Sequence, residues 1–160
     1  MQPRFRRHEA MFAAGLSART SNEAEMDPDR ARIPALWRKF HQDALIESTA
    51  QRVTNSAPLG VYLDYENGAE GDYTVVAAVE VSDLSRVAEP LFGVVIDAGD
   101  YIVFTGEGAM PEAVIAAWRH VWEFFARPRC DELRRSFTVD FERHVNDNTV
   151  EIWIAVETGG

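Results

Sequence analysis

The sequence predicts an α+β domain in which duplicated strand-helix-strand-strand units form an antiparallel sheet with helices on one face. Periodic segments follow one another as strand, helix and hairpin, and then as strand, helix and hairpin again. Short motifs also recur about 80 residues apart, as internal repeats do: Leu36-Trp37-Arg38 resembles Ala117-Trp118-Arg119, and Leu63-Asp64-Tyr65-Glu66 resembles Val139-Asp140-Phe141-Glu142. We therefore expect a single domain over residues 1–160, with half-repeats at about 1–82 and 90–160.

The first half begins with a strand over Met11–Thr20, where Gly15 suggests a bulge or a close approach of backbones. A helix is predicted from about Ala31 to Ile46, because its apolar residues follow the three-four spacing of an amphipathic helix. Leu59–Glu66 and Tyr73–Val81 then form a hairpin, joined by a turn that contains glycine and asparagine.

The second half repeats this order. Leu91–Glu107 is predicted to be a long strand, interrupted at residues 97–100. Pro111 suits the first turn of a helix that runs to about Ala126. The last hairpin, residues 136–157, has a polar turn at residues 144–148 between two runs rich in β-branched and aromatic residues.

Alternation in this last hairpin predicts one apolar face toward the helix and one face toward a cleft. Phe141 and Ile152 are expected on the apolar face, and Glu142 and Trp153 on the opposite face, turned away from the helices. The same parity in the first half adds further candidates for the cleft: Tyr62, Glu66, Ala78 and Glu80. Helical and strand spacing adds three aromatic candidates: Phe104, Trp118 and Trp122. Trp37 is assigned to the core.

Acidic and aromatic side chains around a hollow favour an organic cation as ligand. A cation over an indole ring gains roughly 0.5–2 kcal/mol. A carboxylate at about 4 Å adds around 4 kcal/mol of Coulomb energy at an effective dielectric constant near 20. We therefore expect a largely apolar pocket for amphipathic cations of drug or dye size.

Composition restricts the partners and the compartment. The net charge of −10 argues against a nucleic-acid-binding surface, which needs a basic patch. No apolar run is long enough for a signal peptide or a membrane span. The single cysteine, Cys130, excludes an internal disulfide and fits a reducing compartment. The four histidines lack metal-ligand spacing. We expect a cytoplasmic protein without metal or cofactor, as a monomer or a homodimer.

The chain resembles the GyrI-like small-molecule-binding domain family, which also supplies the effector-binding domain of AraC-type and multidrug-responsive transcription regulators. The segments that carry the resemblance are residues 15–20, 33–37, 60–62, 98–104, 141–142 and 150–154, together with Gly108, Pro111 and Trp118. The resemblance implies a duplicated fold with a ligand cleft at the pseudo-twofold axis. It implies that Glu142 is the pocket acid and that Trp153 lines the pocket. His144 stands where the family commonly has Tyr, and Ala155 where it commonly has Pro.

Three functions follow as hypotheses. The first is a free-standing module that senses or sequesters an amphipathic organic cation, without a helix-turn-helix of its own but with a DNA-binding chain as a conceivable partner. The second, less favoured, is a hydrolase of strained cyclopropyl-type genotoxins in which Glu142 activates water as a general base. The third is a gyrase-inhibitor-like interaction protein that uses the acidic turn around Glu66 and Glu70.

Overall fold

The computed structural model describes residues 3–127 and 133–158, and Cys130 lies outside them. The first elements are β1 (Arg4–His8), β2 (Met11–Ser21), α1 (Asn22–Glu25), α2 (Ile33–Gln42), α3 (Leu45–Ser48), β3 (Leu59–Leu63), β4 (Asp72–Val81) and β5 (Phe92–Ile96). They are followed by β6 (Gly99–Glu107), α4 (Glu112–Phe125), β7 (Leu133–Arg135), β8 (Val139–Asn146) and β9 (Thr149–Thr158).

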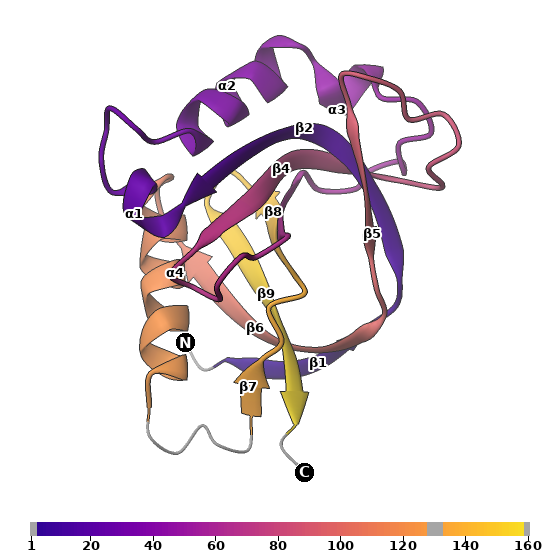
Figure 1. Ribbon diagram of the computed structural model, residues 1–160. Coiled ribbons are helices and arrows are strands. Elements are labelled where there is room, and N and C mark those ends of the chain that lie inside the picture. Colours follow the sequence, from indigo (N-terminus) through magenta and orange to yellow (C-terminus); the bar gives the residue numbers. More distant parts are fainter. Residues whose placement is uncertain (1–2, 128–132, 159–160) are drawn as a thin grey trace.

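In the described residues, nine strands form one antiparallel sheet in the order β1-β6-β9-β8-β3-β4-β2-β5, with β7 added beside β9. The sheet curls into a half-barrel, and both α2 and α4 lie on its outer surface (Figure 1). The two repeat units are β2-α2-β3-β4 and β6-α4-β8-β9, and they meet where β3 pairs with β8. This arrangement confirms the predicted fold class.

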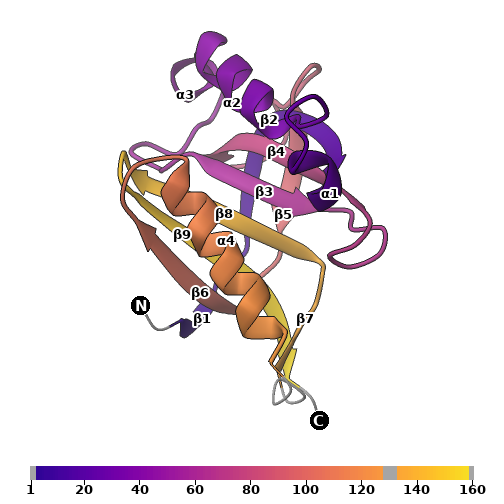
Figure 2. The same cartoon turned by 90° about the vertical axis from the view of Figure 1, so that its left-hand side faces the viewer.

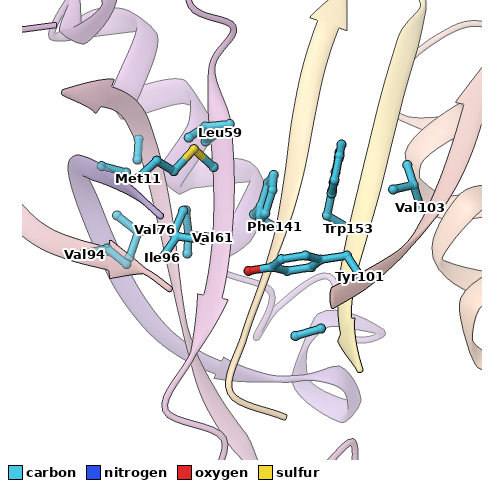
Figure 3. Packing of buried hydrophobic residues seen from close by; sticks show 13 residues of the cluster. Met11, Leu59, Val61, Val76, Val94, Ile96, Tyr101, Val103, Phe141 and Trp153 are labelled. Carbon is cyan, nitrogen blue, oxygen red and sulfur yellow. The ribbon is translucent and has the colours of Figure 1, made fainter. Parts of the chain in front are cut away.

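Both faces of the curled sheet are apolar, each for its own reason. The inner face encloses a core that includes Val61, Phe141 and Trp153, whose side chains point into the half-barrel (Figure 3). On the outer face, α2 covers one apolar cluster around Phe40 and α4 covers another around Phe104. Figure 2 shows α4 lying across the second half of the sheet and α2 across the first. Because the chain buries apolar side chains on both faces, alternation alone cannot tell which face is inside.

The helices begin and end for local reasons. Pro34 lies in the first turn of α2, where its missing N–H is not needed. The helix ends at Gln42, earlier than predicted, because Ala44 adopts a left-handed conformation with φ of 52° that no α-helix continues. The helix predicted from Pro111 to Ala126 is confirmed as α4.

The predicted long strand over Leu91–Glu107 is two strands with different neighbours. β5 pairs with β2 at one end of the sheet order, whereas β6 pairs with β9 and β1 at the other end. The predicted interruption near residues 97–100 is therefore a corner between the two ends of the curled sheet. Two strands, β1 and β7, were not predicted. None of the helices in the described part of the chain is long and apolar enough to cross a membrane.

Candidate functional site

Glu142 is a buried carboxylate at the seam between the two halves. It lies on β8 and is only 3% exposed. Its Oε2 accepts hydrogen bonds from the Tyr62 hydroxyl at 2.9 Å and from the Trp118 indole Nε1 at 2.6 Å. His144 Nε2 lies 3.0 Å from Oε1 and donates to it when Glu142 is ionised. We call these four residues the acid cluster.

Both halves of the molecule contribute to the acid cluster. Tyr62 comes from β3 in the first half, whereas Glu142 and His144 come from β8 and Trp118 from α4 in the second half. Burial and the adjacent Glu142 carboxylate raise the pKa of Tyr62 well above its ordinary value, so the phenol stays protonated and donates. The Trp118 indole packs against the apolar clusters beneath both helices, so it lies where the two halves meet.

Gly60 makes room for the carboxylate. It pairs directly with Glu142 across β3 and β8. A Cβ atom placed on Gly60 would lie 2.6 Å from Glu142 Oε1 and 3.3 Å from Cζ2 of Trp37. The first of these contacts is shorter than van der Waals packing permits, so glycine here lets the acid lie against the sheet.

Each of the helices α2 and α4 places an indole ring beside the Glu142 carboxylate. Trp37 on α2 lies with its ring centroid 5.0 Å from that of His144. Trp118 on α4 lies 5.0 Å from Tyr62. The two tryptophans are the pair in the sequence repeat, so the duplication places one indole from each half beside the carboxylate.

An apolar groove of about 560 Å³ lies on the same outer side of the sheet. Its main lining residues are Met26, Trp122, Phe125, Leu133, Arg135 and Phe137. Trp122 is 38% exposed, and its ring centroid lies 6.4 Å from that of Trp118. The two tryptophans of α4 therefore connect this aromatic groove to the acid cluster.

One wall of the aromatic groove holds a buried ion pair. The Arg135 guanidinium lies 2.7 Å from Asp140, and Arg135 and Asp140 have side-chain exposures of 7% and 0%. The hydroxyl of Tyr65 and the backbone N–H of Ala155 also donate to Asp140. The Arg135 guanidinium stacks 4.2 Å from the centroid of the Phe137 ring. This network ties β7, β8 and β9 together beneath the groove.

The structure brings four of the predicted site residues together on one side of the sheet: Tyr62, Trp118, Trp122 and Glu142. Phe104 lies on the same outer face but is buried beneath α4, in ring contact with Phe124 and Phe125. Glu66 lies in the exposed turn after β3 and pairs with Arg19 at 3.6 Å.

Three predicted site residues lie on the other side of the sheet. Trp153 and Ala78 belong to the inner core, and Glu80 follows Ala78 on the same face of β4. The expectation that Glu142 and Trp153 share a face is wrong, because Trp153 pairs with Phe141 and Glu142 pairs with Ile152. Phe141 and Trp153 stack with their rings 5.5 Å apart and 9° from parallel (Figure 3).

The cleft side was also predicted the wrong way round. Val61 and Phe141, expected toward the helices, point into the half-barrel, and Tyr62 and Glu142 lie on the outer face, where Trp118 of α4 donates to Glu142. The register shift between His144 and Asn146 affects which residues of β8 and β9 share a face, whereas the side of the whole sheet was predicted wrongly because both faces are apolar. Turn chemistry alone does not locate such a shift.

Sequence reasoning missed three residues of the site. Trp37 was assigned to the core, although its repeat partner Trp118 was a site candidate. Gly60 carries no side chain, so a search for candidate side chains does not find it. His144 was noted only as a departure from a family pattern. The repeat signal could have found Trp37, because a residue equivalent to Trp118 faces the same seam.

Within residues 3–127 and 133–158, no group of three His, Cys, Asp or Glu side chains is placed to hold a metal ion.

A family model and a curated relative both match most of this chain. The family model for Cass2, the integron-associated effector binding protein, matches residues 6–156. The Bacillus subtilis (strain 168) protein YobU, named as a candidate transcriptional regulator, is 33% identical over 134 residues, which cover 82% of this chain and 79% of YobU.

Two solved structures extend the likeness to the fold. The integron cassette protein VCH_CASS2 from the mobile metagenome of Vibrio cholerae is 32% identical, with a TM-score of 0.82 over 97% of this chain and 95% of that one. SAV2435, solved with bound tetraphenylphosphonium, has a TM-score of 0.78 at 17% identity over 98% of this chain and 94% of that one. The second likeness shows the fold alone.

Proposed function

Because the chain belongs to the Cass2 family of integron-associated effector binding proteins, we propose that its effector is an amphipathic organic cation that binds at the acid cluster. The observation that carries the proposal is the Glu142 carboxylate, 3% exposed and flanked by Tyr62 and two tryptophans. Burying a carboxylate is costly unless a positive charge or several hydrogen bonds compensate for it. A ligand cation would supply the charge.

Neutral donors hold Oε2 of this carboxylate. In the part of the chain that the structure describes, neither an arginine nor a lysine forms an ion pair with Glu142. Among the described residues His144 is the one partner of the carboxylate that can carry a positive charge, and a ligand cation at about 4 Å would gain around 4 kcal/mol of Coulomb energy before desolvation. Indole rings on both sides favour a cation that carries apolar or aromatic groups.

The aromatic groove would hold the apolar part of such a ligand. Its volume of about 560 Å³ is in the range of small-molecule sites. Trp118 lies between the groove and the acid, so a ligand whose charge reaches Glu142 would move this indole or replace its hydrogen bond. The lipophilic cation tetraphenylphosphonium, bound by the structural neighbour SAV2435, supports this ligand class.

We further propose that the chain is a sensing or sequestering module. The name of the relative YobU, a candidate transcriptional regulator, supports a sensing role in which a DNA-binding partner reads the bound state. An acid between two tryptophans serves either role, because both need affinity for the effector.

A pair of probes of the same shape and opposite charge tests the ligand class. Titration calorimetry compares tetraphenylphosphonium with tetraphenylborate on the wild type and on Glu142→Gln. We expect the wild type to prefer the cation, and Glu142→Gln to lose about tenfold or more of its affinity for the cation, which corresponds to about 1.4 kcal/mol. Binding of the anion should not fall.

The matched control is Glu66→Gln, which makes the same change in net charge in an exposed turn. This variant should bind the cation as the wild type does. Equal affinity of the wild type for both probes, or an unchanged cation affinity in Glu142→Gln, would reject the proposed site.

A further inference from the structure

The two oxygens of Glu142 have different partners. Oε2 receives the Tyr62 hydroxyl and the Trp118 indole N–H, which are neutral groups. Oε1 receives His144 Nε2 at 3.0 Å. Among the side chains that the structure describes around Glu142, His144 is the one partner that can take a positive charge near neutral pH.

His144 is also the accessible member of the pair. Its side chain is 25% exposed, against 4% for Glu142. Its backbone N–H donates to the carbonyl of Pro58 at 3.0 Å, and a register shift in the hairpin follows it directly. The backbone is thus held, and the partly exposed imidazole lies between Glu142 and the Trp37 ring.

We infer that His144 is an internal cation that competes with the ligand for Glu142, so that binding of an organic cation expels a proton from His144. The inference rests on the proposed function and adds to it a residue that sets the charge requirement of the site. Two positive charges beside one carboxylate repel each other. By linkage, the bound ligand lowers the affinity of His144 for a proton by a certain factor. Protonation of His144 lowers the affinity of the site for the ligand by the same factor.

The other groups around Glu142 do not explain a coupling between ligand binding and proton release. Trp37 on α2 faces His144. His41 lies beyond this indole, with its ring centroid 6.2 Å from that of Trp37. From β3 and α4 the neutral Tyr62 and Trp118 meet the same carboxylate. The adjacent Arg143 belongs to the opposite face of β8, where it pairs with Glu151 and lies over the Trp153 ring.

Calorimetry in two buffers of different ionisation enthalpy measures the protons released when tetraphenylphosphonium binds. Between about pH 5.5 and about pH 8 the wild type should release protons on binding, seen as a difference between the apparent binding enthalpies in the two buffers. Its dissociation constant should rise about tenfold between about pH 8 and about pH 5.5. His144→Gln keeps an N–H donor but cannot be charged, so it should release no proton and bind with nearly the same affinity across this range.

His41→Gln is the matched control, since it removes a histidine from the neighbouring α2 without touching the carboxylate; it should release protons as the wild type does. If His144→Gln does not fold, the ring resonances of His144 in the wild type serve instead, because a saturating cation should move their titration to lower pH.

The outcomes separate the two proposals. Absence of cation binding by the wild type at every pH would overturn the proposed function. Binding without proton release would overturn the role of His144 alone. Proton release that persists in His144→Gln would also overturn it and would assign the titration to another group, with Glu142 the first to test.

Discussion

Gly60→Ala is expected to push the Glu142 carboxylate out of its place. Gly60 does not have a left-handed backbone, so alanine meets no conformational penalty there. The new Cβ would instead lie 2.6 Å from Glu142 Oε1 and 3.3 Å from the Trp37 ring. Because Oε1 is the oxygen that His144 contacts, the displacement should break this hydrogen bond first.

Two effects determine how much Gly60→Ala lowers the free energy of unfolding. Inserting one methyl group into a packed site costs about 1–3 kcal/mol when the neighbours cannot move freely. Loss of a hydrogen bond to a charged group costs about 1.5–3 kcal/mol, although relief of the contact offsets part of the first term. We expect the free energy of unfolding to fall by about 1–3 kcal/mol, and the affinity for tetraphenylphosphonium to fall about tenfold.

A double-mutant cycle isolates the contact. Urea unfolding is measured for the wild type, Gly60→Ala, Glu142→Ala and the double variant. Without the Glu142 carboxylate, the added methyl group meets only the Trp37 ring, so Gly60→Ala should then cost less than about 0.5 kcal/mol. A cost that is equal in both backgrounds would refute the close packing of Gly60 against the acid.

Gly99→Ala is the control for a glycine-to-alanine change in a strand of the same sheet. A Cβ on Gly99 would have nothing within 4 Å. Its effect on stability should stay within about 0.5 kcal/mol.

Two further predictions concern other parts of the molecule. Trp153→Phe should leave the affinity for tetraphenylphosphonium within about twofold, because the Trp153 ring stacks on Phe141 inside the half-barrel, away from the acid cluster; a large loss in calorimetry would contradict this separation. Stability should fall as the pH rises above about 10, because burial raises the pKa of Tyr101 to about 12 and that of Tyr62 well above its ordinary value. Unfolded tyrosines lose their protons near pH 10 while these two keep theirs, so the stabilisation is complete below that pH and is lost toward the folded-state pKa. Urea midpoints against pH measure the fall, and Tyr62→Phe should make it shallower.

The arrangement of elements was largely predictable from the sequence, because it depends on local patterns. The apolar stripe of α4 and the strand alternation predicted correctly that Ile152 and Ile154 face the helix. β1 escaped prediction because Arg4–His8 is mostly exposed and carries three arginines, which hide any apolar alternation.

The faces of the site were not predictable, for a physical reason. Alternation identifies an outside only when one face of a sheet is wet, and here the inner core and the helix-covered outer face are both apolar. Phe141 and Glu142 are therefore both buried, and so is Asp140. The burial of the two acids depends on partners from elsewhere in the chain, which local periodicity does not report.

The pairing of β3 with β8 determines whether the site exists at all. Gly60 and Tyr62 lie on one strand of this pair, and Glu142 and His144 on the other. Helices α2 and α4, one from each half, place Trp37 and Trp118 beside the same carboxylate. A half-repeat alone would carry either the donor Tyr62 or the acid, but not both. A cation that draws on Glu142 and on indoles from both helices binds only when the two halves are joined, so its affinity should stabilise this seam against separation.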